Sequence, residues 1–130
     1  MTANDPGVNG DGFPAPAPPA FFGGLDLGQM ADYTALAVLE RTEHREEGGR
    51  VLRYAVRHLQ RWPLRTPYPD IVSDVVTLYA KQPLADSQLT VDRTGVGVAV
   101  SDLLRDAGPR AWLVPVTITG GASTAFVDGC

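Results

Sequence analysis

The chain has 130 residues, of which 44% are hydrophobic, and no apolar stretch approaches the roughly 20 residues that a membrane-spanning helix requires, so no membrane partner is expected. The formal net charge of −4 argues against a general nucleic-acid binder. A single cysteine, Cys130, excludes an internal disulfide, and acidic residues stand where a secretory signal needs a cationic start, which together favour the cytoplasm.

The charge is unevenly distributed along the sequence. Seven of the 11 basic residues lie between Arg41 and Arg65, and the same window holds three glutamates, so it carries +4 while the rest of the chain carries −8. A basic lobe beside an acidic body steers a polyanion toward a carboxylate site. A solvated hairpin face is the alternative interpretation.

The first third of the chain predicts a tail followed by a hairpin. Residues 1–20 are rich in Pro, Ala and Gly and indicate a disordered tail. The first strand is expected at 21–27, and its alternation places three residues on one face: Phe22, Gly24 and Asp26. A nearly continuous apolar run predicts a central second strand at 33–41, followed by a charged loop at 43–49.

Residues 50–59 fit two patterns, because the spacing of Leu52, Val56 and Leu59 also suits a helix. The preceding Gly48-Gly49 turn and the short span before Pro63 favour a strand. In that strand Val56 and His58 fall on one face, opposite Arg53 and Arg57.

Helices and strands then alternate. The apolar spacing predicts a helix over 71–79, a short strand at 87–92, a helix over 98–107 that stops at Gly108-Pro109, and a strand at 111–119. Trp62 and Trp112 are expected to be packing anchors. The domain therefore covers 21–121, and residues 122–130 form an unstructured end.

This element order, β-β-β-α-β-α-β, predicts an α/β fold with a mixed five-stranded sheet. The strands at 21–27 and 87–92 should be parallel neighbours. Asp26 and Asp92 would then lie close together near the carboxyl ends of these strands, where open α/β sheets build their sites.

Four segments carry a resemblance to a known family: Gly24 to Gln29 with Asp32 to Ala35, Tyr54 to Trp62, Leu89 to Gly97, and Pro115 to Gly121. Their order and spacing resemble the ribonuclease H-like fold, and more closely the nuclease domain of phage and prophage terminase large subunits. The resemblance implies a metal-dependent endonuclease that uses Mg²⁺ or Mn²⁺ to cut double-stranded viral DNA during packaging. It also implies terminase or portal components as partners, in the cytoplasm of a bacterial or phage-infected cell.

The resemblance assigns roles to individual residues. Asp26 would bridge two metal ions and Asp92 would hold one of them, as the catalytic pair. Arg93 or Thr94 would touch the scissile-strand phosphate, and Arg53 and Arg57 are further expected DNA contacts. The family has a third acidic residue on a helix after the last strand, whereas here that helix is missing from the expected elements and Asp128 is the only late carboxylate. We therefore expect a truncated domain with low or absent activity, supported better by Mn²⁺ than by Mg²⁺.

Three other interpretations stay open. The two aspartates have a structural alternative as turn caps. Asp26-Leu27-Gly28 also matches the Asp-x-Gly start of actin- and hexokinase-like nucleotide-binding proteins, which share a related fold. A catalytically dead ribonuclease H-like scaffold is the third, because the third carboxylate is missing.

Overall fold

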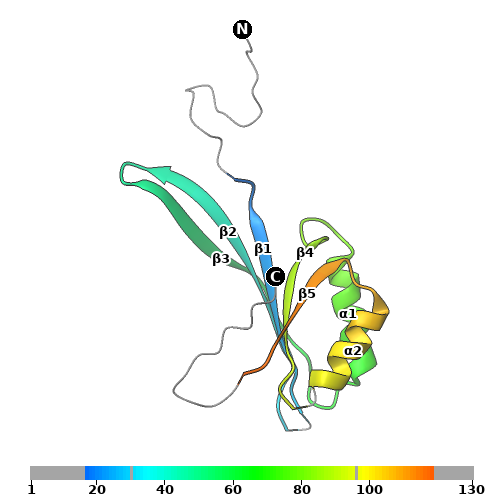
Figure 1. Cartoon of the computed structure of the whole chain (residues 1–130). Helices are drawn as coiled ribbons and strands as arrows, with labels where there is room; N and C mark the ends of the chain where they lie inside the picture. Colours follow the sequence, from blue (N-terminus) through cyan, green and yellow to red (C-terminus); the bar gives the residue numbers. More distant parts are fainter. Residues whose placement is uncertain (1–16, 30, 96, 119–130) are drawn as a thin grey trace.

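The computed structural model describes residues 17–29, 31–95 and 97–118, and its elements follow the predicted order (Figure 1). They are β1 (Ala20–Asp26), β2 (Ala35–Glu46), β3 (Gly49–Arg61), α1 (Tyr68–Tyr79), β4 (Ser87–Asp92), α2 (Gly97–Ala107) and β5 (Ala111–Val116). The mixed α/β class with five strands and two helices is thus confirmed. The last strand ends three residues before the predicted Thr119, and predictions for residues 1–16 and 119–130, including Asp128 and Cys130, lie outside the described residues.

The five strands form one mixed sheet in the order β3-β2-β1-β4-β5. Strands β1, β2 and β3 are antiparallel neighbours, whereas β1 pairs with β4, and β4 with β5, in parallel. Parallel pairing needs a crossover, and α1 and α2 supply it. The predicted neighbourhood of the strands that carry Asp26 and Asp92 is confirmed.

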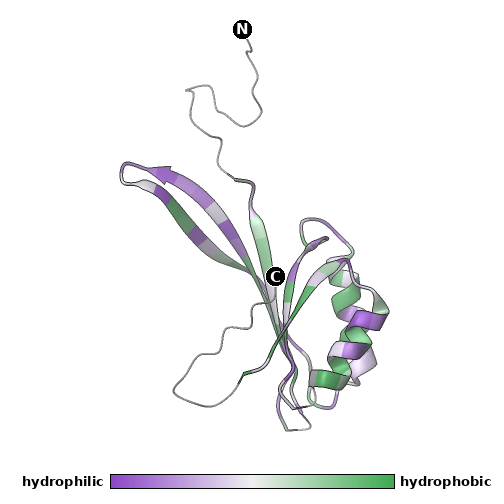
Figure 2. Ribbon diagram, viewed as in Figure 1, coloured by the Kyte–Doolittle hydropathy of each residue, from purple (hydrophilic) through white to green (hydrophobic). Residues whose placement is uncertain are grey.

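The β2–β3 hairpin is longer than predicted, and it extends beyond the body of the sheet (Figure 1). β1 begins opposite Arg41, so residues 42–53 pair only with each other; we call them the hairpin arm. The predicted charged loop at 43–49 was wrong, because β2 continues to Glu46. The charged residues that suggested a loop form ion pairs across the two strands, Arg50 with Glu43 and Arg53 with Glu46. Figure 2 shows hydrophilic residues predominating toward the tip of the arm.

β3 is a strand, as favoured, but its predicted face pattern holds only as far as Val56. The register shifts between Val38 and Leu39, so Leu39 pairs with Val56 and Val38 pairs with His58, leaving Arg57 as an extra residue. Such a bulge reverses which side chains face each way. His58 is consequently half-buried on the face opposite Val56, where its ring nitrogen Nε2 lies 3.1 Å from the Gln60 side-chain oxygen.

Both helices pack on the same face of the sheet and bury its apolar residues there (Figure 1). The core includes Leu25, Leu36, Val38, Leu89 and Val91 from the strands and Ile71, Val75, Tyr79, Val100 and Leu104 from the helices. No helix among the described residues is long and apolar enough to cross a membrane.

Tyr79 is the largest fully buried side chain, and it lies directly under β1. A Cβ atom added to Gly23 would stand 1.9 Å from the Tyr79 hydroxyl, so glycine is required for this approach. Burial raises the pKa of Tyr79 to about 12, and the neighbouring Ser87 side chain opposes the rise. Neither hydroxyl has a hydrogen-bond partner of acceptable geometry among the described residues.

The opposite face of the sheet carries no described helix, and we call it the open face (Figure 1). Toward the end that carries Asp26 its central strands present small residues, Gly24 on β1 and Ala35 and Ala37 on β2, whereas Phe22 and Leu39 follow on the same face further along these strands. The outer strands add exposed large apolar residues, such as Leu59 (73% exposed) on β3 and Trp112 (61% exposed) on β5. The two tryptophans therefore differ, since Trp62 is buried as a packing anchor and Trp112 is exposed, contrary to prediction.

A candidate metal centre at one end of the open face

Asp26 and Asp92 are the last residues of β1 and β4, and both project from the open face. β1 pairs with β4 from Phe22 opposite Gln88 to Leu25 opposite Val91. Continuing this register by one residue places Asp26 beside Asp92, on strands about 4.8 Å apart. The expected meeting of the two carboxylates at one end of the sheet is thus consistent with the strand pairing.

The two carboxylates differ in their surroundings. Asp92 Oδ1 accepts hydrogen bonds from the backbone N–H of Thr94 (2.9 Å) and from its hydroxyl (2.6 Å). This is the geometry of a side-chain-capped turn, so one oxygen of Asp92 holds the loop after β4 while the other is free of hydrogen bonds within the described residues. Asp26 is exposed and makes neither a hydrogen bond nor an ion pair with any described residue.

These two carboxylates fit the needs of one divalent cation. Mg²⁺ is held in proteins by one or two carboxylates and keeps several waters, and Mn²⁺ prefers the same oxygen ligands. Asp26 and Asp92 Oδ2 provide two such ligands on one surface. Across residues 17–29, 31–95 and 97–118 no group of three or more His, Cys, Asp or Glu side chains gathers as a metal site, so a second ion has no further protein ligand there.

The loop after β4 is built to hold Asp92 in place. The Thr94 hydroxyl donates to Asp92 and also accepts the backbone N–H of Ile118 at 3.0 Å, which joins this loop to the segment after β5. Arg93 anchors the same loop, because its backbone N–H donates to the Val116 carbonyl at 2.7 Å. Thr94 is therefore engaged within the protein, which favours a positioning role over the expected contact with phosphate.

Gly95 brings the loops after β1 and β4 together. Its φ is +70°, in the left-handed region that favours glycine, and an added Cβ would lie 3.0 Å from the side-chain nitrogen of Gln29. Gln29 was not among the predicted site residues. The spacing of three residues after Asp26 gave no signal that it would reach the Asp92 loop.

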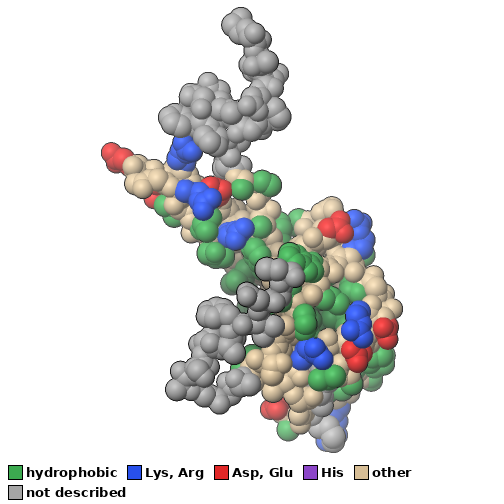
Figure 3. Space-filling model, in the orientation of Figure 1, with side chains coloured by type: hydrophobic (Ala, Val, Ile, Leu, Met, Phe, Trp, Pro, Cys, Tyr) green, Lys and Arg blue, Asp and Glu red, His purple; other side chains and the backbone are tan. Residues whose placement is uncertain are grey.

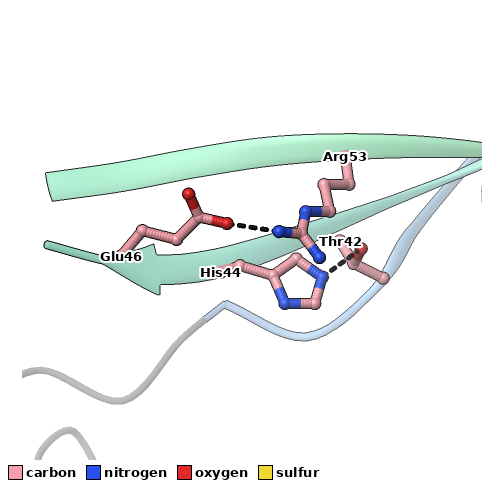
Figure 4. Close-up of polar contacts among 4 residues, drawn as sticks. All are labelled: Thr42, His44, Glu46 and Arg53. Atoms are coloured by element: carbon pink, nitrogen blue, oxygen red, sulfur yellow. Dashed lines mark hydrogen bonds and ion pairs between the residues drawn. The ribbon is translucent and has the colours of Figure 1, made fainter. Parts of the chain in front are cut away.

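The expected DNA contacts Arg53 and Arg57 lie away from the carboxylates. Arg53 forms an ion pair with Glu46 on the face of the hairpin arm that also carries Thr42 and His44 (Figure 4). Arg57 donates to Glu40 at 2.9 Å. β2 residues with even numbers, including Leu36 and Val38, face the helices, so both arginines pair with glutamates on the side opposite Asp26.

A cavity of about 160 Å³ lies beside the β1–β2 loop, on the helix side of the same sheet end. Its lining includes Gly28, Gln29, Asp32, Arg65 and Tyr68. The Gly28 N–H donates to the Thr34 hydroxyl and its carbonyl accepts the Tyr68 hydroxyl, both at 3.0 Å. The glycine of Asp26-Leu27-Gly28 thus has no free amide for a phosphate, which removes support from the nucleotide-binding alternative.

Comparison with known proteins gave no matching family model, no matching curated protein and no matching solved structure. The functional assignment consequently depends on the geometry of this chain's own residues.

Proposed function

We propose that this chain is a metal-dependent nuclease domain that hydrolyses phosphodiester bonds in DNA. The observation that supports it is the placement of Asp26 and Asp92 at adjacent positions of parallel strands, both on the open face. Asp26 has no hydrogen bond or ion pair within the described residues, so no stabilising role in the fold is evident for it. A shared divalent cation would use Asp26 together with the oxygen of Asp92 that the Thr94 cap does not engage.

Each residue at this end of the sheet has a distinct part in the proposal. Asp26 and Asp92 would hold the ion, which when bound polarises a phosphate oxygen and lowers the pKa of a coordinated water. Thr94 fixes one oxygen of Asp92 and so directs the other outward. Arg93, half-buried beside the pair, stays a predicted phosphate contact.

The finer assignment to the ribonuclease H-like nucleases, and to the terminase large subunit of phages and prophages, is part of this proposal. It is supported by the element order and by the parallel pairing of the strands that carry the aspartates. Double-stranded viral DNA would be its substrate, with terminase or portal components as partners. Because two carboxylates, and no third, meet among the described residues, we expect weak activity, better with Mn²⁺ than with Mg²⁺.

Nicking of supercoiled plasmid in Mn²⁺ tests the proposal directly. We expect the unmodified chain to convert supercoiled plasmid to the open circle. The variants Asp26→Asn and Asp92→Asn should each slow this conversion by at least about a hundredfold, because loss of a residue that merely supports a metal ligand already costs up to about that much. Asn keeps the shape of Asp and retains the turn cap at position 92, so the loss reports the charge.

Asp32→Asn is the matched control, because Asp32 is an exposed carboxylate in the loop after β1 and undergoes the same change in charge. It should nick like the unmodified chain. Equal nicking by all four proteins would refute the assignment of Asp26 and Asp92, and no nicking by any of them would favour the dead scaffold.

A further inference from the structure

Four of the six arginines of the β2–β3 hairpin fall into two sets, and of the other two Arg50 forms an ion pair with Glu43. Arg53 and Arg57 form ion pairs with glutamates on the helix side, as described above. Arg41 and Arg61 lie on the open face. Arg41 pairs with Ala20 on one side and with Tyr54 on the other. Arg61 pairs with Ala35, which in turn pairs with Asp26. The strand register, which the sequence alone did not give, separates the two sets.

Arg41 and Arg61 are both held against aromatic rings. The Arg41 guanidinium lies 5.0 Å from the centre of the Phe22 ring, and that of Arg61 lies 4.0 Å from the centre of the Tyr33 ring. Neither arginine has a hydrogen bond or ion pair with another described residue. A guanidinium stacked on a ring keeps its N–H groups available at the edge, which suits a phosphate.

Exposed aromatic rings lie on the same face. Tyr54, 59% exposed, is the direct cross-strand neighbour of Arg41. Trp112 stands at the other side of the sheet, in the row that contains Phe22 and Gln88. Between these flanks, a Cβ on Gly24 would meet no described atom within 4 Å, so the described residues leave space on the face at this position. Figure 3 shows hydrophobic and basic side chains interleaved along the hairpin.

We propose that the open face binds a single strand of nucleic acid, with phosphates on Arg41 and Arg61 and bases stacked on Tyr54 and Trp112. Arginines that have no ion pair with another described residue, together with exposed rings on the same face, are the combination that single-stranded nucleic acid uses. A fully paired duplex hides its bases and would leave the rings unused, so the double-stranded substrate proposed above would present one unpaired strand to this face. This inference extends the proposed nuclease function and rests on it for the choice of nucleic acid as ligand.

The face also explains how the strand would reach the carboxylates. Arg61 pairs with Ala35 of β2, which lies six residues before Arg41 on the same strand. The two arginines are therefore about 20 Å apart along the sheet. Arg61 lies in the same row as Asp26, so a strand that follows the two arginines ends at the candidate metal centre.

Fluorescence binding in EDTA tests this inference without metal and without cleavage. The probes are labelled oligothymidylate of about 20 nucleotides, longer than the few nucleotides that one such surface binds, and a duplex of equal length. We expect tighter binding of oligothymidylate, with quenching of the emission of exposed Trp112 while buried Trp62 is unaffected.

The variants carry matched controls. Trp112→Leu keeps apolar area but removes the ring, and it should weaken binding of oligothymidylate about tenfold. Arg41→Ala and Arg61→Ala should each weaken it several-fold and reduce the slope of log affinity against log salt by about 0.7. Arg53→Ala and Arg57→Ala remove the same charge from the other face and should bind like the unmodified chain.

Two results would overturn the inference. One is an equal loss of oligothymidylate affinity in the Arg41 and Arg53 variants while Trp112→Leu has no effect. This result would indicate that the oligonucleotide is attracted to positive charge in general. The other is that no oligothymidylate binds while sedimentation shows a dimer that Trp112→Leu dissociates. This result would make the open face a contact between two copies of the chain. Nicking that depends on Asp26 would persist in either case if only this inference fails, whereas binding without nicking would isolate a failure of the nuclease proposal.

Discussion

At the scale of single residues, the two adjacent glycines of β1 have different reasons to be glycine. Gly23 faces the helices, where an added Cβ would meet the Tyr79 hydroxyl at 1.9 Å and Leu89 at 2.9 Å. Gly24 faces outward, where it would meet nothing within 4 Å. Neighbouring residues of a strand point to opposite faces. Substitutions at Gly23 and at Gly24 therefore test the packing on the two faces of the sheet separately.

We predict that Gly23→Ala lowers the free energy of unfolding by about 1–3 kcal/mol, because the core has no room for the methyl group. Gly24→Ala should leave it unchanged or raise it by up to about 1 kcal/mol, since alanine restricts the unfolded chain. Urea denaturation measures both. Tyr79→Phe removes the clashing hydroxyl and should recover part of the loss in the Gly23→Ala background. Equal effects of the two alanines would contradict the placement of Tyr79 under β1.

At the scale of elements, α1 is tied to the end of β3 by one buried indole. The Trp62 ring N–H donates to Asp74 Oδ2 at 2.8 Å, and Trp62 is 4% exposed. Asp70, one turn earlier on α1, is exposed in the first turn of the helix. Their four-residue spacing puts Asp70 and Asp74 on one side of the helix, and nothing in that spacing indicates that only one of them holds a tryptophan.

Removing these carboxylates should therefore have unequal effects on stability. Asp74→Ala leaves a buried N–H without its acceptor and should cost about 1–3 kcal/mol. Asp70→Ala loses only its interaction with the helix dipole, about 0.3–1 kcal/mol. Thermal unfolding of the two variants makes the comparison, and the packing of α1 described here would be wrong if Asp70→Ala were the more harmful.

The elements themselves were largely predictable, because Gly and Pro residues separate them and the apolar spacing changes between strand and helix. Ser87–Asp92 was found with its observed bounds for this reason. The end of β2 was missed, since its last charged residues are paired across the hairpin and leave no apolar alternation. The face on which each β3 side chain lies beyond Val56 depends on a bulge, and no residue type in the sequence indicated this bulge.

At the scale of the whole molecule, the sheet has two unlike faces. One is closed by α1 and α2 over a continuous core, and the other combines a pair of carboxylates, two arginines stacked on aromatic rings, and exposed rings. The neighbourhood of the two strands that end in Asp26 and Asp92 was predictable from element order, because parallel neighbours end at the same edge. The distribution of arginines was not, because it depends on the register and the bulge of β3.

The account depends most on a single divalent ion shared by Asp26 and Asp92, and titration with Mn²⁺ measured by calorimetry tests this claim most directly. We predict one bound ion per chain, and at least tenfold weaker binding in Asp26→Asn and in Asp92→Asn, a difference of about 1.4 kcal/mol or more. The double variant should bind little worse than either single variant, because both changes remove ligands of one ion. Asp70→Asn should bind like the unmodified chain. Unchanged Mn²⁺ affinity in the Asp26 variant, or no binding by the unmodified chain, would contradict the shared metal centre.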